Sequence, residues 1–263
     1  MKRLLTIAGS DSGGGAGIQA DLKTFHQFGC YGMSVLTAVT AQNSLGVHGI
    51  ETLPPEFVAL QLESVVTDFG VDGAKMGMLA NVDIVRALAA RMRALEIPHL
   101  VVDPVMRAKG GDSLLADDAQ QALCDEIIPL AEIVTPNLPE AEILAGFEIR
   151  SKDDMRRAAR VIHENGARNV LVKGGHRAED ATDIFFDGEN FTELFAERIE
   201  SGNTHGTGCT YSAAIAANLA LGQNMADAVA VAKRFVTAAI RESLPLGRGI
   251  GPLNHFVSIN HSR

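Results

Sequence analysis

The sequence predicts an α/β protein whose central, mostly parallel sheet carries helices on both faces. Short apolar runs alternate with longer segments of helical period along the whole chain, a pattern typical of βαβ units. The 263 residues, 46% hydrophobic and 21% charged, can bury a large core without disulfides. No linker, low-complexity tract or internal repeat interrupts the chain, so we expect residues 1–263 to form one domain.

The strands are expected where short apolar runs are bounded by glycine, proline or polar residues. These runs are LLTIA at 4–8, GMSVLTAVTAQN at 32–43, DGAKMG at 72–77, HLVVD at 99–103, EIVTP at 132–136 and NVLVK at 169–173. Two more, TDIFF at 182–186 and FTELFAERI at 191–199, flank the turn residues DGEN. This spacing predicts a hairpin that adds a small antiparallel edge to the sheet.

Segments of helical period connect these strands. The first, at 18–28, follows a glycine-rich stretch and ends at Gly29, and the second begins at Pro54-Pro55 and runs to about Asp68. The other helices are expected at 82–95, 138–145, 152–164, 207–221 and 224–242. Because the segment at 207–221 is apolar nearly all round, it is expected to be a buried helix.

Charge and cysteine content exclude several classes of protein. The formal charge is −9 and no basic block is present, which argues against a nucleic-acid partner. The three cysteines, Cys30, Cys124 and Cys209, form no CxxC pair, so neither a disulfide framework nor a zinc site is indicated. The apolar run at 4–8 is too short for a signal peptide, and no apolar stretch could span a bilayer. We expect a cytoplasmic protein without a membrane partner.

The carboxyl ends of the predicted strands carry most of the polar chemistry. In open α/β sheets the ligand crevice lies beyond those ends. The residues found there are Gly9-Ser10-Asp11, Gln42-Asn43, Asp103, Asn137 with Glu140 one turn on, and Lys173-Gly174-Gly175-His176. We therefore expect them to meet in one cleft, although no two groups are neighbours in the chain.

The stretch Gly206-Thr207-Gly208-Cys209 stands at the mouth of the Ala-rich helix at 207–221. The first turn of a helix presents unpaired N–H groups and partial positive charge, and glycines let a phosphate approach the backbone closely. The composition suits an anion hole. It suits equally a tight turn that only allows close packing.

Cys209 and the strand-end residues each have a structural reading beside the functional one. A helix N-terminus favours thiolate, which can act as a base, but most free cysteines are small buried hydrophobes. Asn137 and Glu140 can cap a helix or hold a hydrated magnesium ion, and Asp103 can cap a loop or bind magnesium. Lys173 can be a solvated charge or neutralise phosphate, Gln42 can cap a strand or read a heterocycle edge, and Met78 can be core.

Several common phosphate and metal motifs are absent. The chain has no GxxxxGK[ST] and no HExxH, and its run Gly13-Gly14-Gly15-Ala16-Gly17 does not complete GxGxxG. A P-loop enzyme, a zinc peptidase and a dinucleotide oxidoreductase are therefore disfavoured.

The ordered set of motifs resembles the ribokinase-type superfamily, and within it the bacterial hydroxymethylpyrimidine and hydroxymethylpyrimidine-phosphate kinases of thiamine biosynthesis. The matching stretches run from end to end: TIAGSD, GAGIQADLKTF, TAVTAQN, KMGML, VVDPVM, TPNLPEAE, VLVKGGH, NTHGTGCT and GIGPLNHF. The glycine loop reads DSGGGAG, a small departure from the D(P/S)SGGAG pattern of that branch. The resemblance implies a ribokinase-like fold, ATP and Mg²⁺ as cofactors, and a homodimer.

The resemblance also implies roles for individual residues. The pyrimidine pocket would be lined by Gly9, Asp21, Gln42, Met78 and Val105. The magnesium and phosphate region would comprise Asp103, Asn137 and Glu140, with Asp103 and Glu140 as metal ligands and Lys173 near the nucleotide phosphates. Gly206, Thr207, Gly208 and Cys209 would form the anion hole, with Cys209 where sugar kinases carry an aspartate base.

This family implies phosphorylation of the pyrimidine hydroxymethyl group and then of its monophosphate. Two alternatives stay open: a pyridoxine or pyridoxal kinase of the same superfamily, alone or as a second activity, and a catalytically silent binding module. Residues 104–113, rich in glycine and charged residues, are expected to form a mobile lid.

Overall fold

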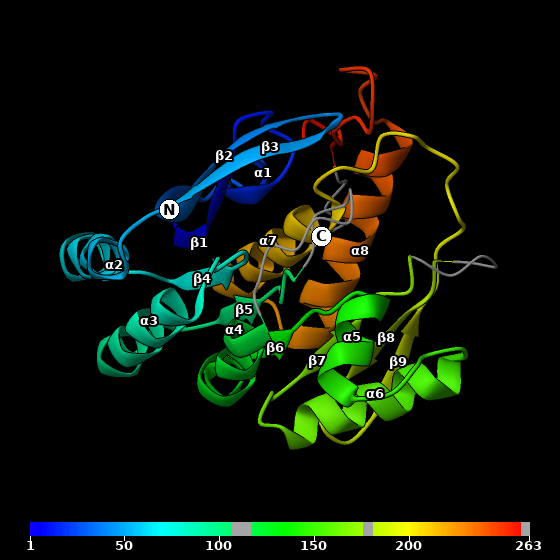
Figure 1. Ribbon diagram of the computed structural model, residues 1–263. Coiled ribbons are helices and arrows are strands. Elements are labelled where there is room, and N and C mark those ends of the chain that lie inside the picture. The colour runs from blue at the N-terminus through cyan, green and yellow to red at the C-terminus, as the bar shows by residue number, and fades with distance from the viewer. Residues whose placement is uncertain (107–116, 176–180, 259–263) are drawn as a thin grey trace.

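The computed structural model describes residues 1–106, 117–175 and 181–258. Within them the chain forms one nine-stranded mixed sheet in the order β3-β2-β1-β4-β5-β6-β7-β8-β9 (Figure 1). The strands are β1 (Arg3–Asp11), β2 (Tyr31–Asn43), β3 (Gly46–Thr52), β4 (Gly73–Met76), β5 (Leu100–Val102), β6 (Ile133–Val134), β7 (Val170–Val172), β8 (Asp183–Phe186) and β9 (Phe191–Leu194). The strands β2, β1, β4, β5, β6 and β7 run parallel, whereas β3, β8 and β9 pair antiparallel at the two edges.

Helices cover both faces of the sheet. They are α1 (Gly17–Gln27), α2 (Pro55–Phe69), α3 (Val82–Leu95), α4 (Asp117–Ala122), α5 (Leu138–Ala145), α6 (Lys152–Glu164), α7 (Thr207–Ala220) and α8 (Met225–Arg241). One apolar core joins the sheet to α2, α3, α4, α5 and α6, and a second joins its other face to α1, α7 and α8. The predicted fold class and its antiparallel hairpin are confirmed.

Helix α7 is the most deeply buried helix next to the sheet. Ala213, Ala214, Ala216 and Ala217 are all 0% exposed, and these small side chains let the helix lie close to the strands while α8 packs on its other side (Figure 1). The prediction of a buried helix here is confirmed. Close packing on two sides fixes the position of its N-terminus, which opens toward the carboxyl edge of the sheet.

Three local predictions were wrong or incomplete. Strand β3 was missed because its residues, GVHGIET, are mostly exposed and carry no continuous apolar run. Helix α4 and the irregular turns that follow it to Leu130 were also missed. Strand β9 ends at Leu194 rather than at 199. Residues 107–113 of the expected lid lie outside the described ranges.

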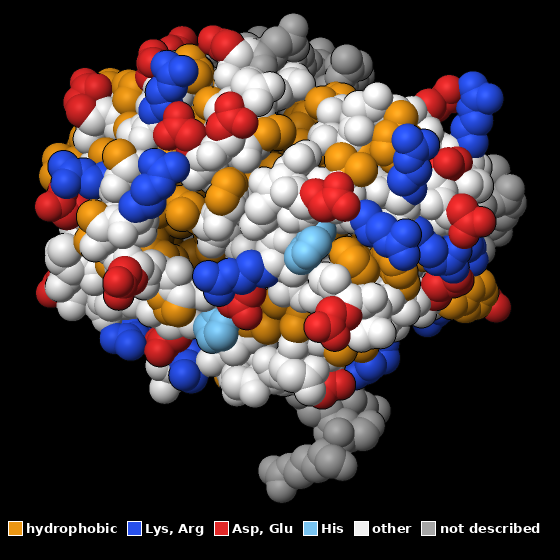
Figure 2. All heavy atoms as spheres, turned by 90° about the horizontal axis from the view of Figure 1, so that it is seen from below, with side chains coloured by type: hydrophobic (Ala, Val, Ile, Leu, Met, Phe, Trp, Pro, Cys, Tyr) orange, Lys and Arg blue, Asp and Glu red, His pale blue; other side chains and the backbone are white. Residues whose placement is uncertain are grey.

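The surface carries charges of both signs. Figure 2 shows Lys and Arg side chains interspersed with Asp and Glu over the face seen there. In the described ranges, no helix is both long enough and apolar enough to cross a membrane.

Candidate active site

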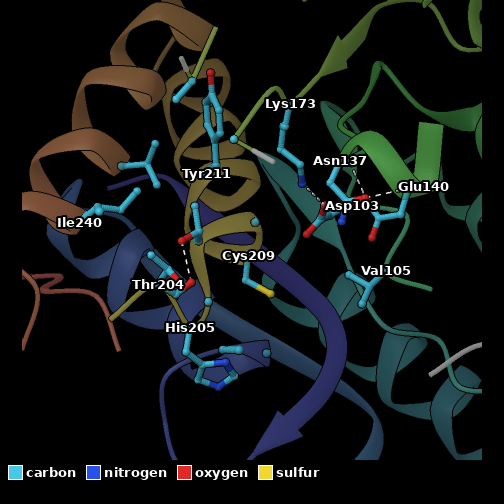
Figure 3. A pocket seen from close by; sticks show the side chains of 18 of the residues that line it. Asp103, Val105, Asn137, Glu140, Lys173, Thr204, His205, Cys209, Tyr211 and Ile240 are labelled. Atoms are coloured by element: carbon cyan, nitrogen blue, oxygen red, sulfur yellow. Dashed lines mark hydrogen bonds and ion pairs between the residues drawn. The ribbon is translucent and has the colours of Figure 1, made fainter. Parts of the chain in front are cut away.

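A cavity of about 1110 Å³ opens at the carboxyl edge of the sheet. Its wall contains every site residue predicted above except Asp21: Gly9, Gln42, Met78, Asp103, Val105, Asn137, Glu140, Lys173, Gly206, Thr207, Gly208 and Cys209. Figure 3 shows Asp103, Asn137, Glu140 and Lys173 on one side of this space and the α7 terminus on the other. The strand ends therefore meet in one cleft as expected, although Asn43 and Gly174 do not line it and His176 lies outside the described residues.

Asp103 and Lys173 form a buried ion pair at the ends of β5 and β7. Lys173 Nζ lies 2.7 Å from Asp103 Oδ1, and the two side chains are 12% and 3% exposed. Burial disfavours the charge on Lys173, but Asp103 and then Glu140 outweigh it and raise the pKa of the lysine. The ammonium therefore keeps its charge inside the cavity, where a phosphate would interact with it in a poorly screened environment.

Asn137 and Glu140 form a complete capping box at the start of α5. The Asn137 side chain accepts from the Glu140 amide at 2.9 Å, and Glu140 Oε2 accepts from the Asn137 amide at 2.8 Å. The capping interpretation is thus correct, and both side chains also line the cavity. Burial raises the pKa of Glu140 to about 7, against the opposing effect of Lys173.

The N-terminus of α7 differs because no side chain caps it among the described residues. Gly206 precedes the helix with a φ of +83°, a left-handed conformation that glycine adopts without strain. The Thr207 amide reaches Thr204 O only at 3.4 Å. Gly208 lies against the ion pair, because a Cβ built there would be 3.2 Å from both Asp103 Oδ2 and Lys173 Nζ. The first turn of α7 thus lies next to the lysine that would neutralise a phosphate.

Cys209 lies in the same first turn. Burial raises the pKa of its thiol to about 11, although Lys75 and the Gly17 amide favour the thiolate. Burial therefore outweighs the opposing effects of Lys75 and the Gly17 amide, and the thiol is protonated at neutral pH. Cys209 can orient a hydroxyl group by hydrogen bonding, but it is not a preformed base.

Gly9, Met78 and Gln42 lie on the wall near the ends of β1 and β2. A Cβ on Gly9 would be 3.1 Å from Met78 Sδ, so glycine keeps this part of the cavity open. Thr40 donates to Gln42 Oε1 at 3.2 Å, and the Gln42 backbone amide donates to Ser12 Oγ at 2.8 Å. The carboxamide is thereby held at the wall, with a donor and an acceptor on one group.

Asp21 departs from the prediction because it does not line the cavity. Its side chain is 0% exposed, Lys75 Nζ lies 2.9 Å from its Oδ2, and Thr6 donates to the same oxygen at 2.5 Å. The residue belongs to α1, whose buried face turns it inward. Burial opposes the charge on Lys75, but Asp21 reverses this and raises the pKa of the lysine. Asp21 acts on the cavity from behind the wall, where its charge also raises the pKa of the Cys209 thiol.

The structure adds cavity residues that the site prediction omitted. Asp11 and His205 meet through a 2.8 Å contact. Lys233 Nζ and Tyr211 OH both bind Asp183 Oδ2, at 2.7 Å and 3.0 Å. Asp11 stood in the strand-end pattern, whereas Lys233 lies on a helix with no motif around it. Residues 196–199, expected to continue a strand, line the cavity instead, as do residues 200–202.

Two cavity carboxylates could contribute to binding a metal. The described residues contain no cluster of three or more His, Cys, Asp or Glu side chains suited to a metal ion. The two carboxylates lie close together, because the charge of Asp103 contributes to the raised pKa of Glu140. One or two carboxylates completed by water and substrate phosphates is the usual arrangement for Mg²⁺, so this donor set fits that ion.

Known proteins share this architecture over nearly the whole chain. The model of the phosphomethylpyrimidine kinase family matches residues 11–254. The hydroxymethylpyrimidine/phosphomethylpyrimidine kinase of Bacillus subtilis is 47% identical, with 99% of this chain and 98% of that protein covered. The thiamine biosynthesis bifunctional protein ThiED of Geobacter sulfurreducens is 54% identical over 99% of this chain, which spans only 53% of that protein.

Solved structures include the ADP complex of Bacillus subtilis pyridoxal kinase. It superposes with a TM-score of 0.91 at 43% sequence identity, with 97% of each chain covered. This similarity agrees with the mixed sheet and its helical layers. From the family match and the full-length similarity together, the chain belongs to the phosphomethylpyrimidine kinase family.

Proposed function

We propose that this chain transfers the γ-phosphoryl group of ATP to the hydroxymethyl group of 4-amino-5-hydroxymethyl-2-methylpyrimidine. A second transfer, to the resulting monophosphate, would give the diphosphate used in thiamine biosynthesis. The observation that carries this proposal is the uncapped N-terminus of α7, which faces the Asp103–Lys173 pair across Gly208. Family membership agrees with it.

The chemistry follows from where positive charge is placed. The attacking hydroxyl oxygen forms a bond to the γ-phosphorus as the bond to the β-γ bridging oxygen breaks. ADP leaves, and the hydroxyl proton passes to water or to an oxygen of the transferred phosphoryl group. Such transition states spread negative charge over the equatorial oxygens. The amides of α7 and Lys173 would stabilise that charge in place, without reorganisation at the moment of transfer.

Other residues would orient the two substrates. Gln42, Met78, Val105 and Gly9 would hold the pyrimidine ring, and the protonated Cys209 would hydrogen-bond its hydroxyl group. Asp103, Asn137 and Glu140 would lie beside the nucleotide phosphates, with Asp103 and Glu140 holding Mg²⁺. The metal would supply additional neutralisation of phosphate charge.

A direct assay tests the proposal. The protein is incubated with ATP, Mg²⁺ and one of three substrates: the hydroxymethylpyrimidine, its monophosphate or pyridoxal. ADP release should be seen with the first two. Activity with pyridoxal alone would favour the alternative suggested by the similarity to a pyridoxal kinase. No ADP with any substrate would favour a silent binding module.

The Gln42→Ala substitution tests the pyrimidine site. The variant loses the group that would pair with the aminopyrimidine edge, so the KM for the pyrimidine should rise about 10-fold, as for one or two lost hydrogen bonds. The KM for ATP should stay within about twofold of wild type, because Gln42 lies on the wall near β2 and away from Lys173. An unchanged pyrimidine KM would contradict the proposed role.

Two predictions from the sequence stay open. The homodimer is tested by the molar mass in solution, from light scattering during size-exclusion chromatography. Magnesium dependence is tested by the loss of ADP release on chelation and its recovery when Mg²⁺ is restored.

A further inference from the structure

The glycine loop, residues 12–17 between β1 and α1, lies directly against the N-terminus of α7. A Cβ on Gly206 would be 1.8 Å from Gly15 O, and one on Gly15 would be 2.5 Å from His205 Cδ2. The Gly17 amide faces the Cys209 thiol and favours its thiolate. These two segments, 190 to 192 residues apart in the sequence, thus touch at three points, and glycine is needed at two of them.

Asp11 ties these two segments together. Its Oδ2 accepts from the amides of Gly15 and Ala16, at 3.0 Å and 2.8 Å, and lies 2.8 Å from His205 Nε2. Its Oδ1 accepts from the Gly13 amide at 2.8 Å. Burial opposes ionisation of Asp11, but His205 and these amides lower its pKa overall. The ionised Asp11 carboxylate therefore accepts the hydrogen bond that His205 Nε2–H donates.

His205 is attached on its other side to the C-terminal segment. Its backbone amide donates to Gly251 O at 3.0 Å. The imidazole is 15% exposed and the Asp11 carboxyl 3% exposed, so this interaction is shielded from water and worth more than a surface contact. The residue after His205 is Gly206, which begins the turn into α7.

The same glycine loop also contacts the acceptor side of the cavity. Ser12 Oγ donates to Gln42 O at 2.8 Å and accepts from the Gln42 amide at 2.8 Å. The loop therefore joins the wall that would hold the pyrimidine to the amides that would hold the transferred phosphoryl group. The Asp11–His205 contact is the side-chain link between those two parts.

We propose that Asp11 and His205 are positioning residues that set the distance between the acceptor hydroxyl and the phosphoryl group. This inference rests on the proposed kinase function. Both side chains lie on the cavity wall, but the pair acts through the glycine loop and Gly206 rather than by binding a substrate. Its loss therefore slows the transfer step and leaves nucleotide binding largely unchanged, since displacements of about 1 Å near reacting groups can cost about 100-fold in rate.

The test compares wild type, His205→Ala, His205→Gln, Asp11→Asn and the double variant Asp11→Asn/His205→Ala in the ADP-release assay. His205→Ala should lower kcat by about 10- to 100-fold, in the range found when supporting contacts are removed, with the KM for ATP within about twofold. His205→Gln keeps a donor near the position of Nε2 and should recover kcat to within about threefold of wild type. The double variant should lose no more than the worse single variant, because both remove one interaction.

Lys23→Met is the matched control. Lys23 Nζ donates to Gly14 O at 2.6 Å and so holds the same glycine loop from its exposed side, without reaching α7. This variant should keep wild-type kcat. Melting temperatures of all variants separate a local effect from loss of folded protein, and His205→Ala and His205→Gln should melt within a few degrees of each other.

The outcomes that would contradict the positioning role can be told apart from failure of the proposed kinase function. Wild-type kcat in His205→Ala, equal losses in His205→Ala and His205→Gln, or an equal loss in Lys23→Met would overturn the positioning role. Additive losses in the double variant would show that the two side chains act separately, which also contradicts it. A wild-type protein that releases no ADP with any substrate contradicts the proposed function itself.

Discussion

Two helices, α5 and α7, begin at the same cavity, but in the part of the chain that the structure describes only α5 has side chains that bind the free backbone amides of its first turn. Helix α5 satisfies its own N-terminus, because Asn137 and Glu140 bind each other's amides. Helix α7 begins at a glycine, has no acid in its first turn, and has no side-chain cap among the described residues. The first terminus is closed by its own side chains, and the second is open to an anion.

The difference shows that one helix N-terminus can contribute to stability while another at the same cavity is left open to bind a phosphate. The capping box at α5 adds helix stability and places a carboxylate beside Lys173. A side-chain cap on α7 would instead occupy the amides that would hold a phosphate. Leaving α7 uncapped forgoes about 1 kcal/mol of helix stability, which its extensive burial against the sheet offsets.

The largest expected effect is at the open terminus. In Gly208→Ala, the new Cβ would lie 3.2 Å from Asp103 Oδ2 and Lys173 Nζ, where it would displace a phosphate from the amides. We expect kcat to fall about 10²- to 10³-fold, as for loss of one oxyanion donor. Alanine is a better helix former than glycine, so the melting temperature of this variant should not fall.

Gly49→Ala, on the exposed strand β3, is the control for a glycine substitution that leaves the cavity intact. Wild-type turnover in Gly208→Ala would mean that α7 does not hold the phosphate, and the contrast between the two helices would lose its functional meaning.

The second prediction concerns what holds α7 from outside the cavity. His255 Nε2 lies 2.9 Å from Thr210 Oγ in the first turn region, and the imidazole is 5% exposed. Burial lowers the pKa of His255 to about 4 from 6.5. Between these values the unfolded chain binds a proton that the folded chain does not, so stability falls as the pH falls.

This linkage should remove about 2 kcal/mol of unfolding free energy between pH 7 and pH 5. Urea unfolding at both pH values measures it in wild type and in His255→Gln. The variant should show a smaller loss over this interval by about that amount. If wild type and variant lose the same stability, His255 does not stay neutral in the folded protein.

The smallest expected effect is at the closed terminus. Asn137→Ala removes half of the capping box and should lower the unfolding free energy by about 1 kcal/mol. Asn137→Asp keeps an equally good cap, so its stability should match wild type, while the added negative charge beside the phosphate region should raise the KM for ATP.

Thermal unfolding and ATP kinetics on this pair separate the two roles of Asn137. If Asn137→Asp were as unstable as Asn137→Ala, the capping box would not explain the stability of α5. If its KM for ATP were unchanged, Asn137 would lie outside the phosphate region.

The sequence by itself determined the parallel sheet, most of its helices and which residues lie at the strand ends. Apolar periodicity carries this information, because each buried strand or helix face must be apolar whatever the rest of the chain does. Position at a strand end was enough to place Asp103, Lys173 and Gln42 at one cavity. Strand β3 was not predicted, because a strand at the exposed edge of a sheet needs no continuous apolar run.

Only the tertiary structure decided which of those residues face the cavity, which are ionised and which pair with each other. Asp21 lies behind the wall because α1 turns that face inward, and the Cys209 thiol is protonated because burial outweighs Lys75 and the Gly17 amide. His205 meets Asp11 from 194 positions away. Pairing, desolvation and orientation depend on groups that are distant in the sequence, and local patterns carry no information about those distances.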